Sequence, residues 1–239
     1  MKALLLVVLT FLGCSGESDR VEAISKLRAL GVSATPSFVS QETSPGAAIS
    51  LEFLVAVPKD HVITAEEYDI SKAEPFSFKI KPDPSTITYQ DVGDLRIAKV
   101  TAAGVLPAEA AAIDFRGVSS FGMKYGLTIK DGGESENIVG AVLIFKEGTT
   151  PAPSGLNVTI NDPVDFSNHA EANIAANLQN PTSEKFKVSW FVSSGEIKNR
   201  RALTTKWTPN KSGEQALIVT ARGLDTGAFT MSSKVVTVK

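Results

Sequence analysis

The feature that most constrains the fold is a two-residue alternation of apolar and polar side chains, which begins after Ala34 and recurs to the end of the chain. A strand turns successive side chains to opposite faces, so this period predicts strands with at least one buried face. Residues that favour turns, such as Gly, Pro, Asn and Asp, separate the runs. The clearest alternating runs lie at residues 49–57, 76–80, 121–129, 156–160, 174–178, 186–192 and 217–221. The run at 138–145 is apolar on both faces, which favours a central strand.

Short strands at about ten-residue spacing predict β-sandwiches. The chain has 239 residues, which is long enough for two domains of ordinary size. Pro and Gly are concentrated at 148–155, the stretch with a linker-like composition. We therefore predict a first β-sandwich domain at 34–147, a linker at 148–155 and a second β-sandwich domain at 156–239, with only the flexible linker joining them.

The two halves also share a pattern. The apolar alternation at 51–55 and Pro58 match the alternation at 174–178 and Pro181, and residues 76–80 match residues 186–190. This similarity predicts two related folds in tandem.

The N-terminus has the features of an export signal. An apolar run at 3–13 follows Lys2 and is too short to cross a bilayer, which needs about 20 residues. The chain has one cysteine, Cys14, and a polar stretch follows it. This arrangement resembles the lipobox of bacterial lipoproteins, although Phe11 and Leu12 depart from the usual residues.

The resemblance implies a lipoprotein signal peptide at 1–13. It also implies a lipidation site at Cys14, where a diacylglyceryl thioether and a palmitate-type N-acyl chain would anchor the protein in the outer membrane. The alternative is an ordinary signal peptide that contains a cysteine by chance and is cleaved elsewhere.

Residues 14–33 are interpreted as a lipidated tether with a short helix at 19–30. Val21, Ile24, Leu27 and Leu30 have helical spacing, Asp19 and Glu22 could form a capping box, and Gly31 could end the helix.

The second half resembles the immunoglobulin-like (Ig-like) domains of bacterial envelope proteins. The residues that carry this resemblance are Trp190 within 188–191, Ser194–Ile197, Trp207-Thr208-Pro209, Gly213 and 217–225. The resemblance implies that Trp190 fills the centre between two sheets. Residues 27–32, Pro36, Pro45-Gly46 and Leu51 resemble the opening of δ-proteobacterial-type lipoproteins with tandem Ig-like domains. The expected fold class is therefore all-β, with two tandem Ig-like β-sandwich domains after the signal peptide and short helix.

Residues for catalysis are scarce. Only two histidines are present, His61 and His169, and no G-x-S-x-G nucleophile motif accompanies them, so we expect no enzyme activity. Basic residues (24) nearly balance acidic ones (26), which gives no electrostatic indication of nucleic-acid binding.

Metal and cofactor sites are not predicted either. Acidic clusters at Glu66, Glu67 and Asp69 and at Asp162, Asp165 and Asn168 lack the calcium-loop pattern, and turn formation explains them more simply. A weak Ca²⁺ site at Asp162 and Asp165 stays as an alternative, and the basic run at 198–201 is interpreted as a solvated loop.

These observations predict a monomeric, non-catalytic protein of the cell envelope. Its Ig-like domains would serve as a binding or spacing module, with the membrane and an unknown protein or polysaccharide as partners. The alternative is a carbohydrate- or peptidoglycan-binding accessory module, which should present exposed aromatic residues. The candidates for that surface are Tyr68, Tyr89 and Phe191.

Overall fold

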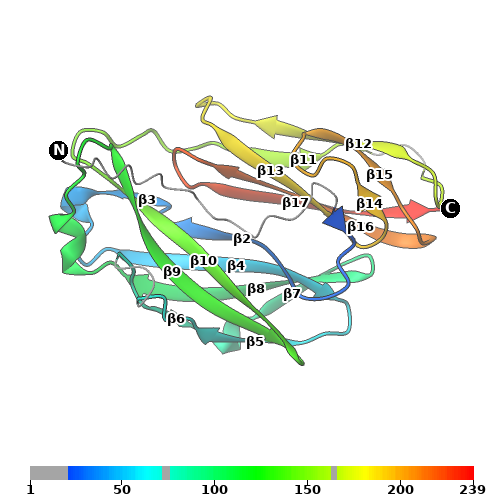
Figure 1. Cartoon of the computed structure of the whole chain (residues 1–239), viewed down its shortest axis with the longest axis horizontal. Coiled ribbons are helices and arrows are strands. Elements are labelled where there is room, and N and C mark those ends of the chain that lie inside the picture. The colour runs from blue at the N-terminus through cyan, green and yellow to red at the C-terminus, as the bar shows by residue number, and fades with distance from the viewer. Residues whose placement is uncertain (1–20, 72–75, 163–165) are drawn as a thin grey trace, which may run out of the picture.

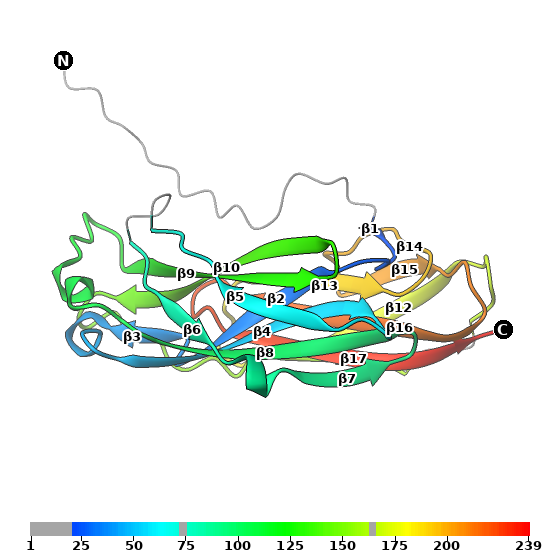
Figure 2. The same ribbon diagram turned by 90° about the horizontal axis from the view of Figure 1, so that it is seen from below.

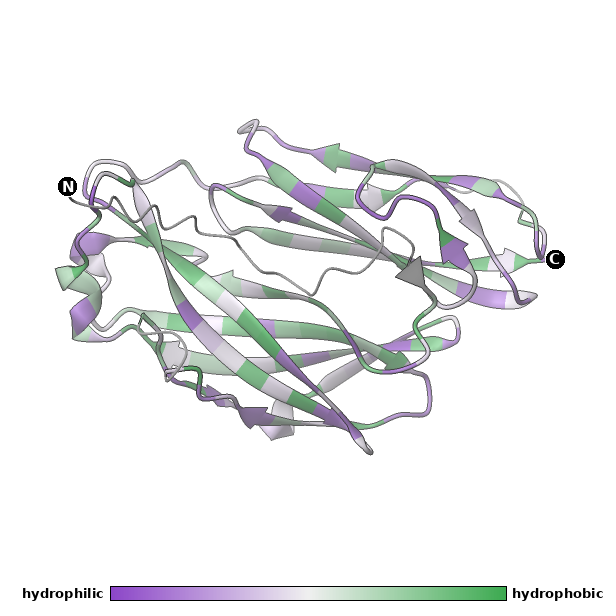
Figure 3. Cartoon of the chain, in the orientation of Figure 1, coloured by the Kyte–Doolittle hydropathy of each residue, from purple (hydrophilic) through white to green (hydrophobic). Residues whose placement is uncertain are grey.

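The computed structural model describes residues 21–71, 76–162 and 166–239, and this part of the chain consists of strands with three short 3₁₀ helices and no α-helix (Figure 1). The strands form two β-sandwiches that follow each other along the sequence. Figure 3 shows the predicted alternation of hydrophobic and hydrophilic residues along β9. The chain is therefore all-β, as predicted.

The first sandwich contains the strands from β2 to β10, which form two sheets. One sheet has the order β2-β4-β8-β6, with β7 also paired to β8, and the other has the order β3-β10-β9-β5. The elements are β2 (Arg28–Thr35), β3 (Phe38–Ser40), η1 (Gln41–Thr43), β4 (Ala48–Pro58), β5 (Ile63–Glu67), β6 (Ile80–Pro82), η2 (Pro84–Thr86), β7 (Thr88–Val92), β8 (Leu95–Val105), η3 (Ala108–Ala112), β9 (Ser120–Asp131) and β10 (Glu134–Phe145).

The second sandwich contains β11 to β17 and also the first strand of the chain, β1. Its sheets have the orders β1-β14-β15-β12-β11 and β13-β16-β17. The strands are β1 (Val21–Glu22), β11 (Asn157–Ile160), β12 (Ala172–Gln179), β13 (Phe186–Val192), β14 (Glu196–Ile197), β15 (Thr204–Thr208), β16 (Gly213–Gly223) and β17 (Phe229–Val238).

The strand order of both sandwiches is that of an Ig domain. From β11 onward, the first, second, fifth and fourth strands share one sheet, and the third, sixth and seventh share the other, which is the constant-type arrangement. The same order results from β2, β4, β8 and β6 in one sheet and β5, β9 and β10 in the other. The prediction of two tandem Ig-like sandwiches is therefore confirmed.

Each sandwich has its own apolar core, built from the inward faces of these strands. In the first, Phe53 of β4 meets Tyr125 of β9 edge to face at 5.9 Å, which joins the two sheets. In the second, Trp190 and Trp207 are fully buried, one from each sheet. The position of Trp190 between the sheets was predicted correctly.

The repeat between the halves is only partly reflected in the structure. β4 and β12 are equivalent second strands, so the match of residues 51–58 with 174–181 is structural. Residues 186–190 lie in β13, a third strand, whereas residues 76–80 lead into β6, a fourth-strand position at a sheet edge. The equivalent of β13 is β5, so the second match is wrong and reflects two unrelated runs of alternating apolar residues.

The helix predicted at 19–30 is wrong for the part that the structure describes, which begins at Val21. The chain there forms β1, an irregular stretch and the start of β2. Ile24, Leu27 and Leu30 are buried as their apolar character predicts, but they reach different clusters: Leu27 enters the first core, and the other two lie between the domains. An extended segment can reach both places, because it rises about 3.3 Å per residue and a helix only about 1.5 Å.

Candidate functional site

The predicted lipidation site, Cys14, lies outside the described residues. The described chain begins seven residues later, with Val21 and Glu22 of β1 paired to Ile197 and Glu196 of β14. Within the described residues, none of the helices is long and apolar enough to span a membrane.

The two histidines lie apart from each other. His61 Nδ1 lies 2.7 Å from Asp131 Oδ2, and the Asp131 side chain is buried, so this pair has the geometry of a base with its orienting carboxylate. In the described part of the chain, no hydrogen bond joins His61 to a hydroxyl or thiol that could act as a nucleophile. His169 is exposed in a turn, with φ at 58°.

The carboxylate clusters do not form a metal site among the described residues. Asp162 is almost fully exposed and forms an ion pair with Lys234, which lowers the pKa of Asp162. Asp165, the second predicted ligand, falls outside the described residues. Glu66 pairs with Lys130 at 2.7 Å across β5 and β9.

The three aromatic candidates for a sugar-binding surface do not form one. Phe191 is only 7% exposed and lies between the domains, so its assignment to an outer surface is wrong. The ring of Tyr68 lies over Gly126 of β9 and is half-buried. Tyr89 is exposed on β7, a different sheet.

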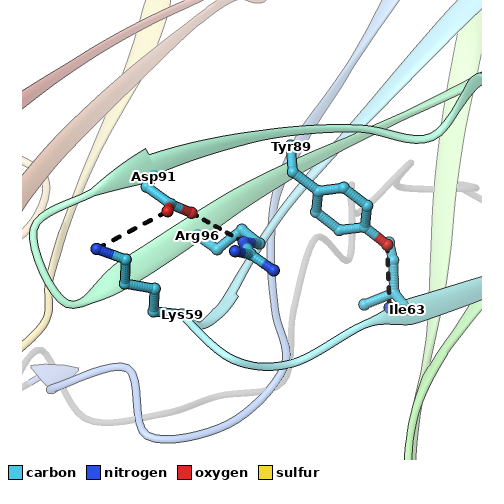
Figure 4. A network of polar contacts seen from close by, with 5 residues as sticks. All are labelled: Lys59, Ile63, Tyr89, Asp91 and Arg96. Carbon is cyan, nitrogen blue, oxygen red and sulfur yellow. Dashed lines mark hydrogen bonds and ion pairs between the residues drawn. The ribbon is translucent and has the colours of Figure 1, made fainter.

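Tyr89 belongs to a polar network at one edge of the first sandwich (Figure 4). The Tyr89 hydroxyl accepts a hydrogen bond from the backbone N–H of Ile63 at 3.3 Å, and the Arg96 guanidinium lies 5.3 Å from the Tyr89 ring centre. Arg96 Nε donates to Asp91 at 2.8 Å, and this hydrogen bond lowers the pKa of Asp91. Lys59 lies 3.8 Å from the same carboxylate. The contacts link β7 and β8 to the start of β5, which is a structural role.

A groove of 810 Å³ runs beside the end of β5, β6 and the end of β8. Carboxylates (Glu67, Asp69) and ammonium groups (Lys79, Lys81) both line it, so its charge favours no single class of ligand. It also adjoins residues 72–75, which the structure does not describe.

A third cluster of buried apolar residues, besides the two cores, forms an interface between the domains. The outer face of the sheet with β2, β4, β8 and β7 meets the outer face of the β13-β16-β17 sheet, and Figure 1 shows β2 and β17 side by side. We call this the interdomain interface. Its buried residues are Ile24, Leu30, Ala56, Val92, Leu95, Ile97, Phe191, Ala216 and Ile218, with Leu54 and Met231 at its margin.

Backbone contacts bring the two domains close together at the interface. Gly93, in the turn between β7 and β8, lies against the backbone of Gln215, where a Cβ would come within 2.9 Å of the Gln215 carbonyl carbon. Gly31, at a bulge in β2, lies against the ring of Phe229, where a Cβ would come within 2.1 Å of a ring carbon. Only glycine leaves room for these two approaches.

A partly buried cation also crosses the interface. Arg222 of β16 donates from Nη2 to the carbonyl oxygen of Val32 at 2.8 Å, and its guanidinium lies 5.6 Å from the Phe229 ring centre. Burial lowers the pKa of Arg222. The Val32 carbonyl belongs to β2, an edge strand, so Arg222 satisfies a group that would otherwise remain open for pairing.

The segment between the sandwiches is held at both ends. Thr149 donates from Oγ1 to the carbonyl oxygens of Lys146 and Ser119, at 2.7 and 3.1 Å. Ser154 donates to the buried carboxylate of Glu184, which also accepts from Thr226 Oγ1 at 2.8 Å. The expectation that only a flexible linker joins the domains is therefore wrong, because the interface and these contacts join them as well.

The interface residues were not predicted from the sequence, although two signals mark them. β4 carries Leu54 and Ala56 on the face where Ser50 and Glu52 are polar, and β16 is buried on both faces from Gln215 to Ala221. Apolar residues on both faces of a strand indicate that a second layer covers it.

Comparisons with known proteins do not assign the chain to a family. No family model matches the chain, and no curated protein matches it. Solved structures with similar folds include fibronectin(III)-like modules of Clostridium thermocellum CbhA (14% identity, TM-score 0.33, 87% of this chain and 94% of that chain covered). A second is a chimeric titin Z1Z2–Z1Z2 tandem (12% identity, TM-score 0.28, 89% of this chain and 99% of that chain covered). A third is the PKD domain of human KIAA0319 (23% identity, TM-score 0.29, 38% of this chain and 91% of that chain covered).

Proposed function

We propose that this protein is a non-catalytic, lipid-anchored protein of the cell envelope, whose two Ig-like domains act together as one rigid spacing or binding module. The observation that carries the module is the interdomain interface. Domains in one chain move relative to each other by default, unless the interface between them is large and hydrophobic. Here it contains buried Leu, Ile, Val and Phe side chains from both domains.

A rigid pair suits a spacer, because it keeps a fixed separation between an anchor and a partner. A flexible pair would lose that separation. The anchor itself rests on the resemblance of residues 1–14 to a lipoprotein signal, and the outer membrane is the proposed location. The carbohydrate-binding alternative has less support, since Phe191 is buried, Tyr68 lies against β9 after the end of β5, and Tyr89 lies on β7 in the other sheet.

The anchor is tested by labelling cells that express the full chain with radioactive palmitate. The wild type should take up label and fractionate with membranes, whereas Cys14→Ser should lose the label and move to the soluble fraction. Ser15→Ala, which keeps the cysteine, is the matched control and should behave as the wild type. Equal labelling of wild type and Cys14→Ser would contradict lipidation at this residue.

A further inference from the structure

The N-terminal segment enters the fold through the C-terminal domain. β1 pairs with β14, and the Ile24 N–H then donates to the carbonyl oxygen of Val192 at 2.9 Å. Only after this does the chain cross to β2 in the N-terminal domain. Figure 2 shows β1 beside β14 and β15, with β3 toward the opposite end of the molecule.

This segment is fixed in place by burial. Ile24, Leu27 and Leu30 are each no more than 6% exposed, and they reach the interdomain interface and the first core. The Ala29 N–H donates to the Glu136 carboxylate at 2.9 Å. The point at which an N-terminal tether leaves the fold is therefore set by β1.

The tether between Cys14 and β1 is short. The seven residues from Cys14 to Val21 reach at most about 25 Å when fully extended. β9 has 12 residues, and a strand of that length extends about 40 Å. The tether is thus shorter than the longer strands, and a membrane that holds Cys14 must stay near the edge at which β1 lies.

The charges around this edge suit an anionic surface. The cations beside β14 and on β15 are Lys198, Arg200, Arg201 and Lys206, and the acidic residues on and beside this edge are Glu22 of β1, Glu171 and Glu196. Glu171 pairs with both lysines, at 2.5 Å for Lys206. One net positive charge remains, and negatively charged lipid headgroups attract such a surface.

We propose that the C-terminal domain is the membrane-proximal one: its β1–β14 edge faces the phospholipid bilayer, and the end of the N-terminal domain that carries η1 and η3 projects away. The order along the membrane normal is then the reverse of the order along the sequence. This inference rests on the proposed lipid anchor at Cys14. It leaves the far end of the N-terminal domain as the surface that a partner can reach.

Energy transfer to the membrane tests the orientation on the full lipidated chain. The thioether consumes the thiol of Cys14, so an introduced cysteine is the single reactive thiol and can carry a fluorophore. Thr204→Cys places it on β15 and Glu109→Cys on η3, both exposed positions. In vesicles of phosphatidylethanolamine and phosphatidylglycerol with an acceptor lipid, transfer should be at least twofold higher from residue 204. Asn173→Cys on β12 is a second proximal position in case Thr204→Cys fails to fold.

The control lengthens the tether. An insertion of about 15 Gly and Ser residues between Gly16 and Glu17 should lower the transfer from residue 204 and reduce its difference from residue 109. Equal transfer from the two positions in the unmodified tether, or higher transfer from residue 109, would overturn the orientation while leaving the anchor intact. Loss of palmitate labelling in the wild type would overturn the anchor and, with it, the orientation.

Discussion

At the scale of single residues, Trp190 is one of the two tryptophans that fill the second core. Its ring is fully buried, and its Nε1 donates to the carbonyl oxygen of Ala202 at 2.8 Å. Trp190→Ala should lower the free energy of unfolding by about 3–5 kcal/mol, because it removes apolar burial and leaves a cavity. The unpaired carbonyl adds to this loss. Urea unfolding followed by circular dichroism measures the change.

The matched control for Trp190 lies on the same strand. Phe186 begins β13 and is 37% exposed, so Phe186→Ala should cost about 1 kcal/mol or less. Similar losses for the two variants would mean that Trp190 does not fill the centre of the sandwich. The neighbouring Phe191 enters the interdomain interface, so unfolding of β13 should also weaken the first domain, unlike what a flexible linker predicts.

At the scale of elements, the turn between β7 and β8 tests the interface. Gly93 has φ at 59° and its missing Cβ would meet the Gln215 backbone, whereas Gly132 has φ at 58° and open space around it. Gly93→Ala and Gly132→Ala share the cost of a left-handed alanine, about 1 kcal/mol. Gly93→Ala should lose a further 1–3 kcal/mol or so, because backbone must move at the interface. Equal losses in urea unfolding would show that this turn does not hold the domains together.

The sequence predicts the strands well because each one buries a face, and burial imposes the two-residue period directly. β4, β9, β13 and β16 all follow runs of alternating or continuous apolar residues. The segment at 19–30 could not be predicted in the same way. Spacing of three is compatible with a helix that buries one face, and also with an extended chain that passes between two cores. The positions of those cores decide between them, and a single segment does not contain that information.

At the scale of the whole molecule, the two domains are joined by an apolar interface, a partly buried arginine and a connecting segment that is hydrogen-bonded at both ends. The linker composition at 148–155 indicates where strands stop, but it does not tell how the flanking domains contact each other. That contact depends on the shapes of two sheet faces formed by residues far apart in the sequence. The apolar outer faces of β4 and β16 indicate that another layer packs on each of these sheets. They do not identify which sheet that layer is.

Residual dipolar couplings of backbone amides test this account most directly, because they report the orientation of each domain relative to a common frame. In a weakly aligned sample of the protein, couplings from residues 28–145 and from residues 157–238 should fit one alignment tensor with the domains placed as in Figure 1. Two tensors that differ in magnitude would mean that the domains reorient independently, and this result would contradict the rigid module.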